Sequence, residues 1–479
     1  MRLRITNKST RTFDVFRFGF ESAGALGFDN EYSGHAADSR LLYWLRRTRA
    51  RMSHCQLNLW GCLMKSQSNP SFVAYIGIDW ADRKHDFCLQ AADSDRRESG
   101  VVAHTPEAIV QWVSGLRQRF AGNIAVCLEI AKGPLINALQ RHEFFVIFPL
   151  NPATLAKYRE AFTPSGAKDD PTDAQLALEL VIRHRDKLQI LKPQSPAMRM
   201  LATLVESRRS LVADKTRITN RLTVALKQYF PQALTWFEHR DTVVFCDFLR
   251  RWPTLKHVKR ARPSTLQAFF HEHNVRFANV VEERIQGIRA AIALTEDRAV
   301  IEPCELTVQA LVEQLTVTLR AIEQFDEKIA SVAQTLPDYQ LFSSLPGAGS
   351  ILAPRLLVAF GEQRERYASA AALQQYSGIA PVIERSGNKC WTHWRLACPT
   401  FLRQTFIEWA GATIPRSFWA AAYYRRQIAR GCSHRMAVRA LAFKWIRILY
   451  RCWQDRVPYD ETTYLNSLQR RGSPLLNTA

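Results

Sequence analysis

The distribution of apolar residues becomes regular from residue 72 onward. Short apolar runs at residues 72–78, 86–90 and 100–104 are rich in β-forming side chains and predict three strands. Apolar residues then recur at helical spacing over residues 106–120, which predicts a helix capped by Thr105. The pattern continues with a strand over 123–130, a helix over 134–142 and a strand over 144–150. This order predicts a mixed sheet covered by helices, an α/β domain.

The chain beyond residue 170 is mostly helical in pattern. Two segments keep apolar residues at alternating spacings of three and four, which predicts two long helices of coiled-coil type. These apolar positions are Leu201, Leu204, Leu211, Ile218, Leu222 and Ala225, and later Leu315, Leu319, Ile322, Ile329, Val332 and Leu336. The two helices either pack on each other within one chain or form a self-association surface, and the spacing favours neither. Between them, the basic, Trp- and Phe-rich residues 235–300 indicate no function.

These patterns divide the chain into five parts. We expect the α/β domain over 71–190, the helical coiled-coil region over 191–340, a mainly α C-terminal domain over 341–460 and a tail over 461–479. Residues 1–70 are rich in arginine without a sustained period and read as a basic N-terminal extension. Met64 opens a polar lead-in to the first strand and is an alternative translation start, in which case residues 1–63 are not native.

Net charge narrows the class of partner. The chain has 479 residues, and 65 Lys and Arg against 44 Asp and Glu give a formal net charge of +21. An excess of this size favours a polyanion as partner, because each neutralised phosphate releases counterions. The alternative is a basic soluble protein with no such partner. A hydrophobic content of 47% excludes a wholly disordered chain.

Composition also bears on location. No stretch approaches the ~18 uncharged apolar residues of a membrane span. The ten cysteines form no CxxC pair, which favours a reducing compartment. We therefore expect a cytoplasmic protein with no membrane partner.

Four carboxylates are the first candidate site. Asp79 ends an apolar strand, Glu129 lies near the end of another, and Asp170 and Asp173 share one face at the start of a helix. A carboxylate within an apolar strand is costly to bury unless it is paired or binds a cation. Four such groups are what a pair of Mg²⁺ ions needs for phosphoryl transfer. We therefore interpret all four as catalytic Mg²⁺ ligands.

Each carboxylate also has a structural interpretation. Asp170 alone is more often a helix N-cap, Asp173 favours the helix dipole, and Asp79 suits a strand-end turn. Asp82, Asp86 and Asp169 are nearby competitors that spacing does not exclude.

A second candidate site lies in the C-terminal region. The turn containing Gly347 and Gly349 is typical of a helix-hairpin-helix, in which the backbone approaches a phosphate, and equally of an ordinary helix connection. Ser386 stands in a polar loop close to cationic side chains, where a nucleophile attacking a phosphodiester is activated. By its residues alone, the Ser-Gly-Asn stretch is most simply a turn. The cations near the serine are Arg385, Lys389 and Arg395.

The rest of this region is dense in arginine with aromatic side chains between. Arginines suit contacts to a nucleic-acid backbone, and aromatic side chains suit stacking on bases. The candidate contact residues are Arg403, Arg425 and Arg426. A solvated basic helix face is the alternative.

The motifs together resemble a known family, the DEDD transposases of IS110-type insertion sequences, which are also described as bridge-RNA-guided recombinases. The resemblance covers about residues 72–455 and is carried by five short motifs. They are Tyr75-Ile76-Gly77-Ile78-Asp79, Leu128-Glu129 with Gly133 following, Lys168-x-Asp170-x-x-Asp173-Ala174, Leu345-Pro346-Gly347-x-Gly349, and Gly378-Ile379-Ala380-Pro381 followed by Ser386-Gly387.

The resemblance implies a fold and an activity. The first domain would be a RuvC-like nuclease domain of the RNase H fold, followed by a coiled-coil dimerisation region and a transposase domain. The carboxylates would hold Mg²⁺, and Ser386 would attack a DNA phosphate to form a covalent link. The implied partners are donor and target DNA, a structured guide RNA and further copies of the chain in dimers and tetramers. A bacterial cytoplasmic protein, associated with the nucleoid when it acts, is expected.

Two other functions remain open at this point. One is a metal-dependent nuclease that cuts DNA junctions without a serine intermediate. The other is a nucleic-acid-binding scaffold whose catalytic site has decayed.

Overall fold

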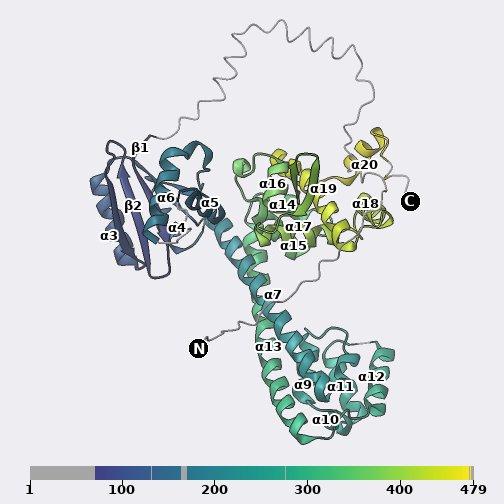
Figure 1. Cartoon of the computed structure of the whole chain (residues 1–479). Coiled ribbons are helices and arrows are strands. Elements are labelled where there is room, and N and C mark those ends of the chain that lie inside the picture. The colour runs from purple at the N-terminus through teal and green to yellow at the C-terminus, as the bar shows by residue number, and fades with distance from the viewer. Residues whose placement is uncertain (1–70, 131, 163–169, 276, 474, 476–479) are drawn as a thin grey trace, which may run out of the picture. The chain divides into compact units, whose positions relative to one another are not determined.

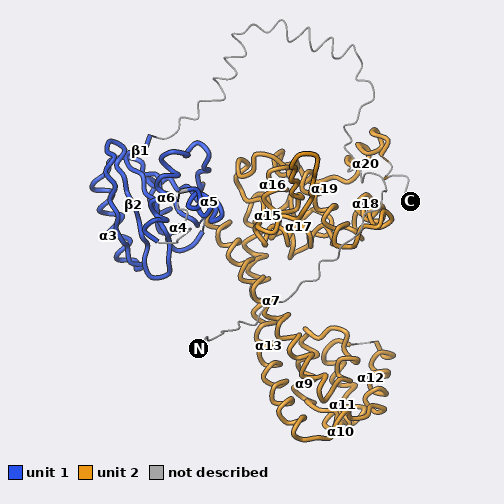
Figure 2. Tube along the Cα trace, viewed as in Figure 1, with its two compact units in different colours: residues 1–191 blue, residues 192–479 orange. Residues whose placement is uncertain are grey.

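The computed structural model describes residues 71–130, 132–162, 170–275, 277–473 and 475. These residues belong to two compact units, one up to residue 191 and one from residue 192 onward, which Figure 2 colours separately. The basic extension predicted over residues 1–70, its alternative start Met64 and Asp169 lie outside the described residues. Each unit is described by itself below.

Unit 1 is built on one mixed sheet of five strands in the order β3-β2-β1-β4-β5. β1 pairs antiparallel with β2, and β2 antiparallel with β3, whereas β1–β4 and β4–β5 are parallel. The predicted mixed sheet is therefore confirmed. The strands are β1 (Phe72–Trp80), β2 (Lys84–Ala91), β3 (Arg97–Ala103), β4 (Asn123–Leu128) and β5 (Phe145–Pro149).

Helices cover both faces of this sheet (Figure 1). The helices are α3 (Pro106–Arg119), α4 (Pro134–Leu139), α5 (Pro152–Phe162) and α6 (Asp170–Arg183), with a short 3₁₀ turn at Arg185–Lys187. Thr105 caps α3 through its side chain, as its sequence predicts. Ile76 and Ile78 of β1 share a core with Val113 of α3, while Cys88 of β2 packs with Leu178 of α6 on the other face. Strand alternation therefore assigns Tyr75, Gly77 and Asp79 of β1 to the face that α6 covers.

Unit 2 contains two long helices, α7 (Pro196–Tyr229) and α13 (Arg298–Gln334). They pack on each other within one chain (Figure 1). Leu201 near the start of α7 shares a core with Val332 near the end of α13, so the helices run antiparallel. Arg208 of α7 forms an ion pair with Asp326 of α13. The two predicted long helices are confirmed, and of the alternatives left open the structure has packing within one chain; self-association stays a prediction.

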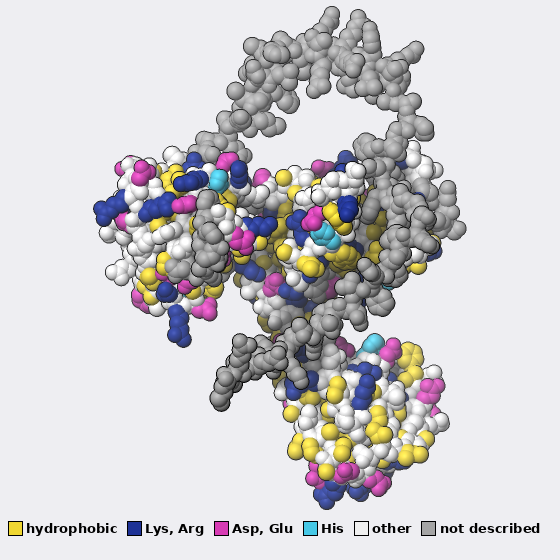
Figure 3. Space-filling view, viewed as in Figure 1, with side chains coloured by type: hydrophobic (Ala, Val, Ile, Leu, Met, Phe, Trp, Pro, Cys, Tyr) yellow, Lys and Arg dark blue, Asp and Glu magenta, His cyan; other side chains and the backbone are white. Residues whose placement is uncertain are grey.

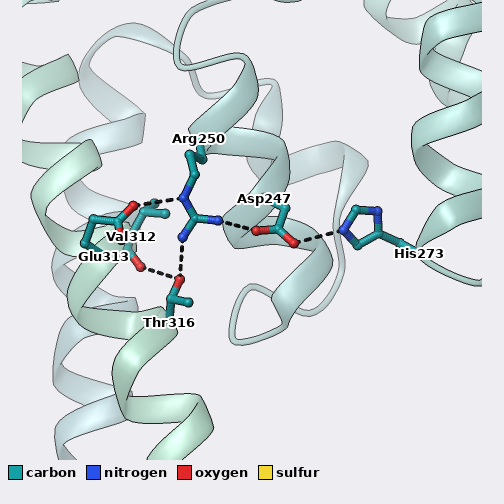
Figure 4. Close-up of polar contacts among 6 residues, drawn as sticks. All are labelled: Asp247, Arg250, His273, Val312, Glu313 and Thr316. Atoms are coloured by element: carbon teal, nitrogen blue, oxygen red, sulfur yellow. Dashed lines mark hydrogen bonds and ion pairs between the residues drawn. The ribbon is translucent and has the colours of Figure 1, made fainter.

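The segment between these helices folds into a small helical layer. Its aromatic residues, which indicated no function in sequence, form a core in which Phe237, Phe248 and Phe270 are buried. Arg250 joins the layer to α13, because it donates to Glu313 Oε1 at 2.8 Å and to Thr316 Oγ1 at 3.0 Å (Figure 4). The helices are α8 (Ala233–Trp236), α9 (Val243–Arg251), α10 (Leu255–Arg260), α11 (Pro263–Glu272) and α12 (Ala278–Ala290).

The C-terminal part of unit 2 is mainly helical with one two-stranded hairpin. Four buried tryptophans, Trp409, Trp419, Trp445 and Trp453, lie in its core. None of the helices in the described part of the chain has the length and hydrophobicity that a bilayer span requires. The elements are α14 (Tyr339–Ser343), α15 (Gly349–Phe360), a 3₁₀ turn at Arg364–Arg366, α16 (Ala370–Tyr376), β6 (Pro381–Ser386), β7 (Lys389–Trp394), α17 (Thr400–Thr413), α18 (Phe418–Ala429), α19 (His434–Asp455) and α20 (Glu461–Arg470).

Candidate active site

Sheet register brings two of the predicted carboxylates to one level of unit 1. Asp79 is the second-last residue of β1. Ile78 of β1 lies opposite Leu128, the last residue of β4, and the two strands are parallel. Glu129 follows Leu128 directly and therefore comes level with Asp79. The sequence predicted that this strand runs to residue 130, whereas β4 ends at Leu128. Asp79 and Glu129 both lie at the carboxyl ends of neighbouring parallel strands, where α/β sheets bind ligands.

Helix α6 brings the other two carboxylates to the same face. Gly77 faces α6 so closely that an added Cβ would lie 2.1 Å from the backbone oxygen of Ala174. Asp79 lies two residues after Gly77 in the strand, so its side chain points to the same face of the sheet. Farther along α6, Val181 packs with Phe72 at the start of β1. The first turn of α6 therefore lies toward the end of β1 that carries Asp79.

Asp170 and Asp173 occupy different surroundings in that first turn. Asp170 begins α6 and is half-buried. Asp173 is buried, and Arg159 of α5 binds both of its oxygens, with Nε 2.7 Å from Oδ1 and Nη2 2.6 Å from Oδ2. Sequence reasoning missed Arg159, because nothing in the pattern singles out this arginine of α5 as the partner of Asp173.

The donor set fits a hard divalent cation by its chemistry. Asp79, Glu129, Asp170 and Asp173 offer only carboxylate oxygens, which Mg²⁺ and similar ions prefer. Among the described residues, no three His, Cys, Asp or Glu side chains lie together closely enough to hold a metal ion.

A further carboxylate lies beside Asp79. Asp86 of β2 is the register partner of Asp79 and is only 5% exposed. Lys84 lies 3.0 Å from it. The sequence marked Asp86 only as a nearby competitor, because strand pairing decides which of the neighbouring aspartates lies opposite Asp79.

The neighbouring His85 is buried on the opposite face of β2. Its Nε2 lies 2.9 Å from Nδ1 of His104. Burial, and then the nearby His104, lower the pKa of His85 from 6.5 to about 4, although Asp86 acts in the opposite direction. His85 is therefore neutral at physiological pH and acts as part of the core.

Ser386 belongs to unit 2 and ends β6. Residues Gly387 and Asn388 form the turn to β7, and Ser386 pairs with Lys389 across it. Gly387 has φ +56°, which a two-residue hairpin turn requires at this position. The serine and its neighbours Arg385, Lys389 and Arg395 are all exposed. The stretch is thus a turn, as the simple interpretation held, and it presents the serine among cations.

Arg439 of α19 holds the base of this hairpin. Its Nε donates to the backbone oxygen of Ile379 at 3.0 Å, and its Nη2 donates to that of Gly378. Its guanidinium carbon lies 3.8 Å from the ring centre of Trp394 at the end of β7. Burial, and then the charge of Arg403, lower the pKa of Arg439. One buried side chain therefore ties together both ends of the hairpin that carries Ser386.

The predicted glycine turn connects α14 to α15. Gly347 has φ +73°, and an added Cβ would lie 2.6 Å from the backbone oxygen of Ala412 in α17. The Trp409 indole donates to the Pro346 oxygen at 3.0 Å, which fixes the same turn. Gly349, with φ +54°, faces open space. Of these two glycines, Gly349 is therefore the exposed one.

The remaining predicted cations are spread over the C-terminal helices. Arg403 lies on α17, and Arg425 and Arg426 lie on α18. Arg425 is exposed, whereas Arg403 and Arg426 are half-buried. On the face seen in Figure 3, Lys and Arg side chains are distributed over both units.

The sheet order, with β1 central and the candidate carboxylates at the ends of β1 and β4, defines the class: an α/β domain of the RNase H type of fold. Comparisons with known proteins agree with this class. Residues 76–231 match the model of the DEDD transposases of IS110 elements, described as "Transposase". Residues 339–425 match a second model, "Transposase IS116/IS110/IS902 family".

Individual relatives align over most of the chain. The "Mini-circle putative transposase for IS117" of Streptomyces coelicolor is 27% identical over 85% of this chain and 99% of its own length. The IS116 "uncharacterized 44.8 kDa protein" of Streptomyces clavuligerus is 24% identical over 80% of this chain and 95% of its own. The IS900 "uncharacterized 42 kDa protein" of Mycobacterium paratuberculosis is 26% identical over 81% and 98%.

The chain belongs to the IS110 family of DEDD transposases, enzymes that act on DNA. The family resemblance seen in the five motifs is therefore confirmed.

Proposed function

We propose that this transposase cuts and rejoins the DNA of its insertion sequence with two groups: a divalent-cation site in unit 1 and Ser386 in unit 2. The observation that carries the proposal is the convergence of Asp79, Glu129 and the first turn of α6 on one face of the sheet. Carboxylates gathered on one face repel one another, and a divalent cation bound among them would offset that repulsion, which supports cation binding.

The carboxylates would supply oxygen ligands for Mg²⁺, two ions in all, which stabilise the charge that develops on a phosphate under attack. Asp79 and Glu129 approach from the strand ends, and Asp170 and Asp173 approach from α6. Asp79 and Glu129 are held by strand register, so their mutual position is set before any ligand binds.

Ser386 would form the covalent link. Its Oγ attacks the phosphorus of a DNA phosphodiester, an Oγ–P bond forms and a P–O bond to one deoxyribose breaks. The serine proton leaves, and the departing oxygen takes up a proton. Attack by a hydroxyl of another strand then reverses the chemistry and joins that strand. Arg385, Lys389 and Arg395 are the neighbouring cations available to the charged phosphate, with Gly349, Arg403, Arg425 and Arg426 as further contacts along the DNA.

The family resemblance supports three further parts of the proposal. A structured guide RNA pairs with donor and target DNA, the protein assembles into dimers and tetramers, and the work is done on the nucleoid of a bacterial cell. The net charge of +21 is compatible with a nucleic-acid partner of either kind. Residues 71–190, 191–340 and 341–460 would be the nuclease, dimerisation and transposase domains.

The test is to incubate the full chain, guide RNA and labelled element-end DNA with Mg²⁺, and then denature the mixture. We expect a protein–DNA adduct that Ser386→Ala abolishes. Asn388→Ala, in the same exposed turn, is the matched control and keeps the adduct. Asp79→Asn should lower strand cleavage roughly 100-fold or more, because it removes a ligand of the cation that would stabilise the charge developing in the transition state.

Each outcome separates the candidate functions. Strand joining that survives Ser386→Ala would contradict the serine mechanism and favour a nuclease that uses the carboxylates alone. Recombination that is unchanged in Asp79→Asn would contradict a catalytic carboxylate site and favour a nucleic-acid-binding scaffold.

A further inference from the structure

The contact between Arg159 and Asp173 concerns the proposed cation site directly. Arg159 lies on α5 and Asp173 in the first turn of α6, and both side chains are largely buried, at 13% and 2% exposed. The guanidinium donates one hydrogen bond to each oxygen of the carboxylate, at 2.7 and 2.6 Å. Such a two-point contact is among the strongest that a carboxylate makes.

This geometry sets up a competition. While Arg159 binds both oxygens, a divalent cation approaching Asp173 meets a guanidinium charge at the same group. A buried carboxylate without a counter-charge is costly, so one cation or the other has to compensate it. Arg159 and a metal ion are therefore alternative partners of Asp173.

The fate of the displaced guanidinium follows from the same reasoning. An arginine stays charged, and a largely buried one that loses its carboxylate needs a new anion. Nucleic-acid phosphate is the anion that the enzyme brings to this site, and guanidinium binds phosphate with the same two-point geometry.

We propose that Arg159 is a positioning residue that exchanges partners: it holds Asp173 in the unloaded enzyme and passes to a DNA phosphate when Asp173 takes the divalent cation. This inference rests on the proposed cation site. DNA that takes up Arg159 frees Asp173 for the cation, and a cation that takes up Asp173 frees Arg159 for DNA. The binding of each ligand should therefore strengthen the binding of the other.

The test measures cation binding rather than activity. Mn²⁺ prefers the same oxygen ligands, and the electron paramagnetic resonance signal of free Mn²⁺ gives its dissociation constant for the full chain. Without DNA, we expect Arg159→Met to bind Mn²⁺ about 10-fold more tightly than the natural protein, within the usual range of coupling between sites. Arg159→Lys should lie between the two, since lysine keeps the charge but loses the fork.

The matched control is Arg97→Met. Arg97 pairs with Glu179, also on α6, at 2.9 Å, and this pair involves none of the four carboxylates. We expect its Mn²⁺ affinity to equal that of the natural protein. Circular dichroism checks that each variant is folded, and Mn²⁺ should raise the melting temperature of Arg159→Met more than that of the control.

A second measurement tests the exchange itself. A short DNA oligonucleotide should strengthen Mn²⁺ binding by the natural protein severalfold, after subtraction of Mn²⁺ bound by DNA alone, and should do so much less in Arg159→Met. Equal Mn²⁺ affinities of Arg159→Met and the natural protein, or an equal gain in Arg97→Met, would overturn the inference while leaving the cation site intact. Mn²⁺ binding that is absent, or indifferent to Asp79→Asn, would overturn the proposed cation site and the inference with it.

Discussion

The α6 face of the sheet in unit 1 and the β6–β7 hairpin in unit 2 hold their reactive groups in opposite ways. Asp79 is the second-last residue of one buried strand and Glu129 follows another, on the sheet face where α6 packs backbone to backbone on Gly77. Ser386 lies at an exposed turn, and an added Cβ at the next residue, Gly387, would meet no atom within 4 Å. Close packing fixes the carboxylates, whereas Ser386 depends on the few contacts at the base of its hairpin.

The difference matches what each group is proposed to do. A cation site needs oxygens held to fractions of an ångström, which a packed sheet provides. A nucleophile that forms a bond to DNA has to reach a phosphate outside the protein, and an exposed turn allows this approach. Substitutions that disturb packing should therefore cost more stability on the α6 face of unit 1 than in the hairpin.

The largest expected effect is on folding of unit 1. Gly77→Ala would place a methyl group 2.1 Å from the Ala174 oxygen and 2.3 Å from the Leu178 nitrogen, so α6 has to move. We expect a loss of about 3 kcal/mol or more in the free energy of unfolding, at the upper end for overpacking, measured by urea denaturation. Gly115→Ala, in the open interior of α3, is the control and should stabilise slightly. Equal, small effects of both changes would show that α6 does not need Gly77.

The second-largest expected effect is a loss of folding stability of unit 1 at acid pH. The pKa of His85 is about 4 in the folded protein against 6.5 for an ordinary histidine, so the unfolded chain takes up the proton first. Stability is therefore lost as the pH falls from 6.5 toward 4, by about 2 kcal/mol from this group. His85→Gln should lose less stability between pH 7 and 4.5, as measured by urea denaturation. An identical loss in the variant would contradict a buried neutral His85.

Removal of the hairpin anchor should have a smaller effect on stability and a clear one on chemistry. Arg439→Met leaves the oxygens of Gly378 and Ile379 without their donor and removes the contact with Trp394. We expect a loss of about 1–3 kcal/mol and a severalfold fall in the Ser386–DNA adduct. Arg435→Met, an exposed position one turn earlier on α19, is the control. Adduct yields that fall equally in both would point to lost DNA affinity instead.

The smallest effect is expected in the turn itself. Gly387→Ala would put alanine at φ +56° with no steric contact, at a cost of about 1 kcal/mol from the backbone alone. Gly387→Asn should recover most of it, because asparagine tolerates this conformation. Thermal unfolding and adduct yield measure both variants. A loss as large as that of Gly77→Ala would remove the contrast between the two regions.

The sequence predicted the elements of unit 1 closely because their signals are local. The residues at 106–120 carry a cap, a proline and a periodic stripe, and α3 forms there. Helix α4 ends at Leu139, three residues earlier than predicted, where the apolar residues stop. The sequence also marked Asp79 and Glu129 at or near strand ends, and the structure has Asp79 second-last in β1 and Glu129 directly after β4. It placed Ser386 in a loop, whereas the structure has it as the last residue of β6.

What the sequence determined by itself, then, is the order of strands and helices up to residue 150, the two long helices and the positions of the candidate catalytic residues along the chain. Only the tertiary structure decided their partners: Asp86 opposite Asp79, Arg159 on Asp173, and Arg439 on Gly378 and Ile379. The physical reason is that strand register and helix packing arise from burial of many apolar residues at once. A residue's own neighbours in sequence carry its secondary structure, but they do not reveal which distant side chain that burial brings against it.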